Sequence, residues 1–244
     1  MNENRPFDGE VLDCLEINPG GEPRASVLWL HGLGADGHDF EPIVHELRLP
    51  ESLPLRFVFP HAPERSVTIN AGMVMRAWYD VYPPSFSKEI DMEGIIESSV
   101  LLRTLIAREL HLGFPPERIL LAGFSQGGAI ALHTGLTYEK RLAGIMGLST
   151  YLPSLEEVMK ARTAANKDIP ILMAHGRMDP MISMTKALQT RQALKRLGYS
   201  IRWQEYPMQH EVCREEINDI RTWLIEVLGS KAAPKSGNLQ EPML

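Results

Sequence analysis

Residues 123–128, with the sequence GFSQGG, constrain the fold of this chain more than any other stretch. An apolar run at 119–122 precedes them and has the composition of a buried strand, and a helix-forming run at 129–136 follows. A Gly-x-Ser-x-Gly turn between a strand and a helix is the setting of a nucleophile elbow, in which a strained serine faces a helix N-terminus. We therefore expect Ser125 to be a nucleophile. The alternative is a glycine-rich turn with an idle serine, and the rest of the chain must decide between them.

Apolar strand-like and helix-like runs alternate along most of the chain. Strands are predicted at 11–17, 25–30, 55–59, 119–122, 142–148, 169–174 and 199–206, and helices at 40–47 (capped by Asp39), 91–110, 129–136, 154–165, 184–197 and 213–228. This alternation predicts an α/β fold with a mostly parallel central sheet, helices on both faces and no large cap domain. We expect residues 1–9 to be a flexible N-terminus, 10–228 a single domain and 229–244 a disordered tail.

Composition and charge exclude several classes of protein. The chain has 244 residues and a net charge of −6, and no Lys/Arg cluster forms a basic stripe, so nucleic acid is not an expected partner. No signal-peptide pattern opens the sequence, and no apolar run approaches the ~18 residues of a membrane span. Cys14 and Cys213 are therefore expected to be free thiols of a cytoplasmic protein without stable membrane insertion.

A serine nucleophile needs a histidine base, which in the α/β-hydrolase order follows the acid. His210 lies between the last predicted strand and the last predicted helix, which is the expected place for the base. Of the other histidines, His133 lies two turns into the helix behind Ser125 and cannot reach back. His175 precedes the acid candidate and is expected to be a packed turn residue, while His31 would require a different order.

The acid that orients the base is expected to be Asp179. It follows a predicted strand, whereas Asp168 precedes the same strand at the opposite edge of the sheet and Asp219 lies in the last predicted helix. Ligands of parallel sheets bind at the carboxyl ends of the strands, so Asp179 and His210 can meet there. Arg177 would weaken the hold of Asp179 on the base if it turned inward, and we expect it to face solvent.

An oxyanion hole needs two backbone N–H donors. The residue after the nucleophile, Gln126, is expected to supply one, and Leu33 in the turn HGLG supplies the other. The alternative for HGLG is a plain turn. No CxxC or paired-histidine spacing indicates a metal site, and no cofactor is expected.

Residues 60–90 are the longest stretch without a predicted element. They carry Met73, Met75 and Trp78, which suit either an adaptable wall for an apolar ligand or a satellite core that pins the loop. Met181 follows the acid turn at the same edge of the sheet. The residues alone leave both interpretations open.

The sequence resembles the bacterial carboxylesterase and acyl-protein thioesterase group of α/β-hydrolases, the phospholipase/carboxylesterase family. The segments that carry the resemblance are HGLGADGHDF, FVFPHAP, TINAGMVMRAWYD, LAGFSQGGAIAL, STYLP, HGRMDPMI and YPMQHEVCREEINDIRTWL, which occur in the family's order over about residues 25–228. The resemblance implies the triad Ser125, Asp179 and His210, the donors Leu33 and Gln126, and an acyl groove beside Trp78. With this groove in mind, we expect the substrate to be bound by Met73, Met75, Trp78 and Met181. Glu211 occupies the position directly after the histidine, where the resemblance implies a small hydroxyl residue.

The resulting hypothesis is a serine hydrolase that cleaves carboxylic esters of short to medium acyl chains through an acyl-enzyme. Thioesters of acylated proteins and lysophospholipids are further candidate substrates, and we allow for a homodimer. Two alternatives keep the same scaffold. In the first, the protein is an enzyme that cleaves amides, an activity that usually goes with a cap domain. In the second, it is a non-catalytic binding protein, which the intact triad disfavours.

Overall fold

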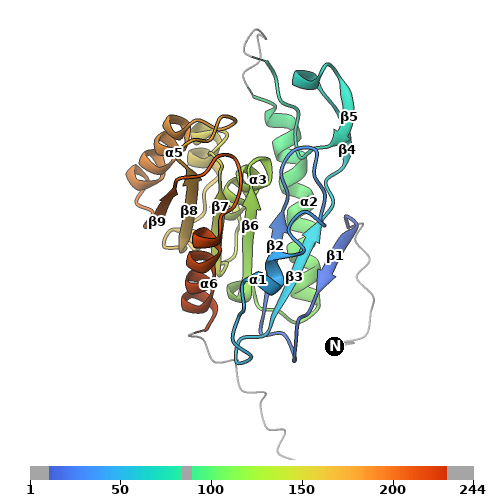
Figure 1. Ribbon diagram of the computed structural model, residues 1–244, viewed down its shortest axis with the longest axis vertical. Coiled ribbons are helices and arrows are strands. Elements are labelled where there is room, and N and C mark those ends of the chain that lie inside the picture. Colours follow the sequence, from blue (N-terminus) through green and yellow to red (C-terminus); the bar gives the residue numbers. More distant parts are fainter. Residues whose placement is uncertain (1–10, 84–89, 230–244) are drawn as a thin grey trace, which may run out of the picture.

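The computed structural model describes residues 11–83 and 90–229. The strands of the main sheet are β1 (Cys14–Ile17), β2 (Ala25–Leu30), β3 (Leu55–Pro60), β6 (Ile119–Phe124), β7 (Gly144–Leu148), β8 (Ile171–Gly176) and β9 (Ile201–Tyr206). Within the described residues these form a seven-stranded sheet in the order β1-β3-β2-β6-β7-β8-β9. β1 is antiparallel to β3 and every other neighbouring pair is parallel, which confirms the predicted mostly parallel sheet (Figure 1).

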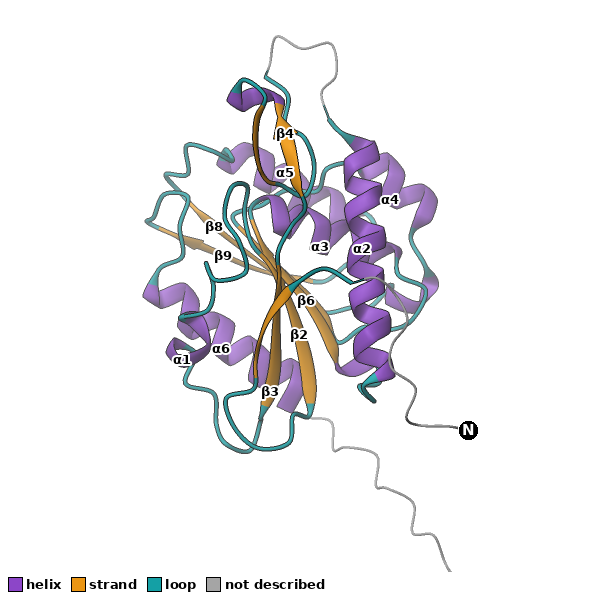
Figure 2. Cartoon of the chain, turned by 90° about the vertical axis from the view of Figure 1, so that its right-hand side faces the viewer, coloured by secondary structure: helices purple, strands orange, loops and turns teal. Residues whose placement is uncertain are grey.

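Helices cover both faces of this sheet. They are α1 (Ile43–Glu46), α2 (Met92–His111), α3 (Gln126–Thr137), α4 (Leu155–Ala161), α5 (Met184–Arg196) and α6 (Arg214–Gly229). In Figure 2, α1 and α6 lie on one side of the sheet and α2, α3 and α4 on the other. No large cap domain is seen over the sheet in the described part of the chain.

The two faces of the sheet have separate cores, because neighbouring residues of a strand point to opposite sides. On β2, Leu28 and Leu30 pack in one cluster with buried residues of α2, α3, α4 and α5. Val27 and Trp29 of the same strand pack in the other cluster, with buried residues of α1 and α6. Strands buried on both faces are mostly apolar, which is why the sequence shows them as nearly continuous runs.

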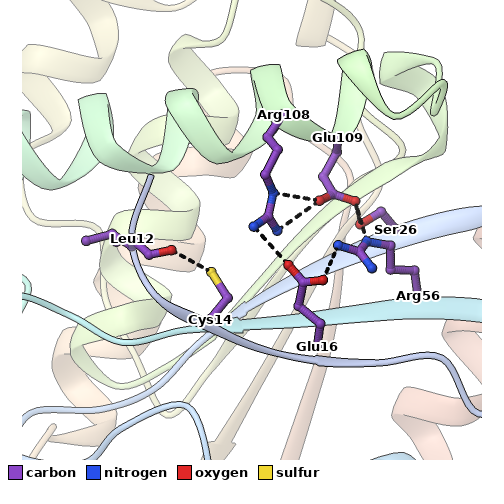
Figure 3. A network of polar contacts seen from close by, with 7 residues as sticks. All are labelled: Leu12, Cys14, Glu16, Ser26, Arg56, Arg108 and Glu109. Carbon is purple, nitrogen blue, oxygen red and sulfur yellow. Dashed lines mark hydrogen bonds and ion pairs between the residues drawn. The ribbon is translucent and has the colours of Figure 1, made fainter. Parts of the chain in front are cut away.

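A buried ionic network ties the edge strand β1 to α2 (Figure 3). Glu109 of α2 is fully buried and accepts hydrogen bonds from Arg56 Nε (2.9 Å), Ser26 Oγ (2.8 Å) and Arg108 Nη2 (3.1 Å). Glu16 of β1 pairs with both arginines, at 2.7 Å from Arg56 and 2.8 Å from Arg108. Because each buried charge has opposite partners, removing one of them would leave an uncompensated charge.

Two local expectations are wrong. The helix predicted over 40–47 is reduced to α1, whose N-cap is Pro42 without a side-chain cap, so Asp39 does not cap it. The stretch 60–90 contains a hairpin of β4 (Glu64–Val67) and β5 (Met73–Arg76), joined through a 3-10 turn at Thr68–Asn70. These short strands are stabilised by pairing with each other, which hydrophobic periodicity does not reveal.

The predicted flexible N-terminus, 1–9, lies outside the described residues. So does the predicted tail, apart from Gly229, which ends α6. In the described part of the chain, none of the helices has the length and apolar composition that crossing a bilayer requires.

Candidate active site

Ser125 lies on a strained turn between β6 and α3. Its φ and ψ are 53° and −119°, a conformation that residues with a side chain rarely adopt. The flanking glycines make this turn possible. A Cβ on Gly123 would lie 2.4 Å from the Gly127 carbonyl carbon, and one on Gly127 would lie 2.5 Å from the His31 and Leu30 oxygens. The strand, turn and helix predicted around Ser125 are therefore present, with the geometry of a nucleophile elbow.

His210 connects the serine to a carboxylate. Its Nε2 lies 2.9 Å from Ser125 Oγ and its Nδ1 lies 2.7 Å from Asp179 Oδ2. The Phe124 ring packs against the His210 ring with 4.7 Å between centroids. Residues from three parts of the chain thus form one hydrogen-bonded row, in which the imidazole can accept the serine proton while the carboxylate holds its orientation.

The turn after β8 fixes the carboxylate. Asp179 Oδ1 accepts hydrogen bonds from the N–H groups of Met181 and Ile182, both at 2.8 Å, which leaves Oδ2 for the histidine. Arg177 turns away from Asp179. Its Nε lies 3.6 Å from Glu205 Oε2 and its side chain is 60% exposed. The predicted outward orientation of Arg177 therefore matches the structure.

The other histidines of this region have structural partners or cannot reach the serine. His175 is fully buried in β8 rather than in a turn, and its Nε2 donates to the Ile182 carbonyl at 2.8 Å. His133 is buried within α3, and burial lowers its pKa. Glu211, which departs from the family pattern, is exposed and accepts a 3.3 Å hydrogen bond from the Gln209 N–H.

His31 orients the loop that carries Leu33. Its Nε2 accepts a hydrogen bond from the Ala62 N–H (3.0 Å), so its Nδ1 holds the proton and donates to the Gly32 carbonyl at 2.7 Å. Burial lowers the pKa of His31 to about 4, so the ring is neutral in this arrangement. The carbonyl and N–H of a trans peptide point in opposite directions, so this bond turns the Leu33 N–H away from the His31 ring.

Gln126 has two roles in the geometry of the site. As the first residue of α3, its N–H is one of the helix amides without an intrahelical acceptor. Its side chain, which the sequence did not single out, accepts from the Trp78 N–H (2.7 Å) and donates to the Tyr79 carbonyl (2.6 Å). The helix behind the serine therefore holds the segment that carries one wall of the site.

A cavity of about 510 Å³ opens beside the serine and the histidine. Its apolar lining comes mainly from the hairpin region and from the turn that holds Asp179, with Leu33, Ile69, Met75, Val81, Met181 and Ile182. Two of the four expected groove residues, Met75 and Met181, line it. Of the remaining apolar lining residues, Ile69, Val81 and Ile182 lie in segments for which the sequence showed no pattern that separates a wall from a loop.

The expected groove residues Met73 and Trp78 do not line this cavity. Trp78 is fully buried, and its indole N–H donates to the His31 carbonyl at 2.9 Å. Met73 is 64% exposed on β5. Trp78 thus supports the loop that carries Leu33, because a buried indole N–H requires an acceptor and finds it in the His31 carbonyl at the start of that loop.

Metal binding is not indicated by the residues near the site. Within 11–83 and 90–229, no three histidine, cysteine, aspartate or glutamate side chains gather in a way that could hold an ion.

The sheet order, the strained serine turn and the position of the site at the carboxyl ends of the strands define an α/β-hydrolase. The sequence profile of the family described as Phospholipase/Carboxylesterase matches residues 12–228. The chain therefore belongs to the phospholipase/carboxylesterase family, and it is a hydrolase.

Individual relatives agree with this assignment. The chain is 40% identical to the acyl-protein thioesterase 1 of Neurospora crassa over 226 residues, which cover 89% of this chain and 92% of that protein. The crystal structure of Arabidopsis thaliana SOBER1 matches with a TM-score of 0.79 and 33% identity over 84% of this chain and 99% of that one. Zea mays acyl-protein thioesterase 2 matches with a TM-score of 0.78 and 26% identity over 89% and 100%. These relatives are fungal and plant proteins, so the bacterial part of the expected resemblance is wrong.

Proposed function

We propose that this protein hydrolyses esters and thioesters of short to medium acyl chains through an acyl-enzyme on Ser125. The observation that carries the proposal is the position of His210, within hydrogen-bond distance of both Ser125 Oγ (2.9 Å) and Asp179 Oδ2 (2.7 Å). The cavity beside these residues has mainly apolar walls, which suit an acyl chain.

In the first half of the reaction, Ser125 Oγ attacks the carbonyl carbon of the substrate and His210 Nε2 takes the hydroxyl proton. The carbonyl oxygen becomes negative and is stabilised by the N–H groups of Leu33 and Gln126, close to the N-terminus of α3. His210 then gives its proton to the departing alcohol or thiol, and the acyl group remains on Ser125. Asp179 keeps the imidazole oriented and stabilises its charged form.

In the second half, a water molecule attacks the acyl carbon while His210 takes one of its protons. The carbon–oxygen bond to Ser125 breaks, the proton returns to Oγ, and the carboxylic acid leaves. Because thioesters and oxygen esters react through analogous tetrahedral intermediates and leave the same acyl group on Ser125, this site can cleave both.

The relatives named acyl-protein thioesterase favour an acylated protein as one substrate, and lysophospholipids remain a second candidate. A cytoplasmic location is part of the proposal, and the free thiols of Cys14 and Cys213 fit a reducing compartment. A homodimer stays a prediction.

The direct test uses a fluorophosphonate probe, which reacts covalently with activated serines. The native protein should be labelled, and Ser125→Ala should lose labelling and about 10⁴-fold or more of ester turnover while keeping its melting temperature. Ser66→Ala, which removes an exposed serine hydroxyl on β4, is the matched control and should keep both. If Ser125→Ala retained turnover within tenfold of the native protein, the proposed mechanism would be wrong.

A further inference from the structure

Two tyrosines meet in the wall of the cavity beside Ser125. The hydroxyl oxygens of Tyr79 and Tyr151 lie 3.0 Å apart, and both residues line the cavity. Tyr79 is 2% exposed and Tyr151 is 9% exposed. No sequence pattern gives either residue a role, since they are far apart in the chain and only the fold brings them together.

Both tyrosines are held close to the nucleophile. The Tyr79 carbonyl accepts a 2.6 Å hydrogen bond from the side chain of Gln126, the residue after the nucleophile. Thr150, which directly precedes Tyr151, donates from its hydroxyl to the Ser125 carbonyl at 2.6 Å. The backbone at each tyrosine is therefore anchored on the elbow, and both tyrosines line the same cavity as Ser125.

The two hydroxyls have one proton more than their mutual hydrogen bond uses. Each hydroxyl can donate one proton, and a single bond between them consumes one. In the described part of the chain neither hydroxyl has another hydrogen bond, so one O–H remains without an acceptor whichever way the pair is oriented. Because both tyrosines line the cavity, this spare O–H is a donor that a polar atom of a bound ligand can use.

The surroundings keep this donor in its protonated form and strengthen it. Burial raises the pKa of Tyr79 well above its ordinary value and also raises the pKa of Tyr151. The Lys186 ammonium lies 3.5 Å from the centre of the Tyr151 ring. A cation against the ring face withdraws electron density from the phenol and makes its O–H a better donor.

We propose that the Tyr79–Tyr151 pair recognises an acceptor oxygen carried by the acyl chain near the scissile carbonyl. The favoured substrates would then be acyl esters or thioesters with an ether, hydroxyl or oxo oxygen among their first few chain positions. This inference rests on the proposed function, because it assigns a substrate class to the same site. An oxygen at this place satisfies the spare O–H, whereas a methylene leaves it buried and unpaired.

The experiment compares matched pairs of p-nitrophenyl esters in which one chain methylene is replaced by an ether oxygen. The pairs are butanoyl with methoxyacetyl, pentanoyl with 3-methoxypropanoyl, and hexanoyl with 4-methoxybutanoyl. For each pair the ratio of kcat/KM values is measured in the native protein, in Tyr79→Phe, in Tyr151→Phe and in the double variant. Dividing the native ratio by the variant ratio cancels the intrinsic reactivity of the ester.

We expect this quotient to reach roughly three- to tenfold for the double variant at one oxygen position at least, the effect of one net hydrogen bond. At least one single variant should show part of it. Tyr138→Phe, at the C-terminal end of α3 and away from the site, is the control and should give a quotient of one. Melting temperatures show which variants fold. If the double variant does not fold, the quotients of the two single variants decide the outcome.

Quotients of one in both single variants and in the double variant, at every oxygen position, would overturn the inference. That outcome differs from failure of the proposed function. If the plain acyl esters are hydrolysed in a Ser125-dependent manner but the quotients stay at one, only the recognition role is lost. If Ser125→Ala still hydrolyses them, the proposed function fails first.

Discussion

The two sides of the active site are built in different ways. The elbow side, which carries the proposed nucleophile Ser125, rests on the centre of the sheet, where β6 is buried over most of its length and all residues of α3 are buried. The hairpin side, which is the other wall of the cavity, rests on the hairpin β4–β5. Most residues of this hairpin are exposed or half-buried. In Figure 1 this hairpin projects beyond the main sheet.

The bonds that hold the two sides differ as well. Ser125 is fixed by backbone packing and by a hydrogen bond from its N–H to the Leu148 carbonyl of β7 at 2.8 Å. The hairpin depends in part on a side chain, since Asp80 accepts hydrogen bonds from the N–H (2.7 Å) and the hydroxyl (2.5 Å) of Thr68, beside backbone bonds such as Gly34 N–H to the Arg76 carbonyl (2.9 Å). We infer that substitutions on the elbow side change catalytic rate, and that substitutions on the hairpin side change substrate preference.

The largest expected effect is on kcat, and it compares Asp179 on the elbow side with Asp80 on the hairpin side. Asp179→Asn should lower kcat by about 10⁴-fold, because the amide no longer holds His210 in the orientation and tautomer that the reaction needs. Asp80→Asn keeps one acceptor oxygen for Thr68 and should stay within tenfold of the native kcat. Steady-state kinetics on one short ester compares the two. Equal losses in both variants would contradict the division between the two sides.

Glycine substitutions should also have different effects on the two sides. In Gly127→Ala the new Cβ would lie 2.5 Å from the carbonyl oxygens of Leu30 and His31, so the elbow cannot keep its shape and the native fold should be lost or fluorophosphonate labelling abolished. In Gly72→Ala, on the hairpin turn, the nearest atom is Ser66 Oγ at 3.4 Å, and the cost is the left-handed φ of 77°, about 1–2 kcal/mol. Melting curves and labelling of both variants provide the measurement. A folded, labelled Gly127→Ala protein would show that the elbow tolerates more than its packing suggests.

The third prediction concerns pH and the buried start of α6, which follows the loop of His210. Burial raises the pKa of Glu216 from 4.5 to about 8. The fold therefore favours the protonated carboxyl, and this contribution to stability is complete below the unfolded pKa and is lost as pH rises through the folded pKa. Glu216→Gln should raise the melting temperature by a few °C near pH 8 and flatten its fall between about pH 5 and 8.

The exposed neighbour supplies the control for this experiment, since Glu215→Gln should leave the pH dependence as it is in the native protein. If Glu216→Gln showed the native pH dependence, the carboxyl would not be the group that destabilises the fold at alkaline pH.

The smallest expected effect belongs to the hairpin wall. Met75 lines the cavity, so Met75→Ala should weaken the preference for longer acyl chains by up to about fourfold, or ~0.8 kcal/mol, for each methylene that packs against this side chain. Val74→Ala, on the same strand and 63% exposed, should change nothing. The measurement is kcat/KM across acyl lengths from acetyl to octanoyl. An unchanged length profile in Met75→Ala would remove the hairpin from the substrate site.

Much of the elbow side could be predicted from the sequence because its signals are local. The run before Ser125 is apolar since β6 is buried on both faces, and the glycines at 123 and 127 mark the close approach of two backbones. The order of serine, acid and histidine, each after a strand, was enough to predict which side chains meet. That prediction depends only on the rule that parallel strands end at one edge.

The arrangement of the hairpin side could not be predicted from the sequence, because it is set by tertiary contacts. Nothing local distinguishes Trp78, which is fully buried and bonded to the His31 carbonyl, from Met75, which lines the cavity three residues earlier. The pairing of β4 with β5 and the meeting of Tyr79 with Tyr151 join residues whose environment is set by distant parts of the chain. Sequence patterns report which residues prefer burial, but the partner that buries each of them is decided only when the whole chain has packed.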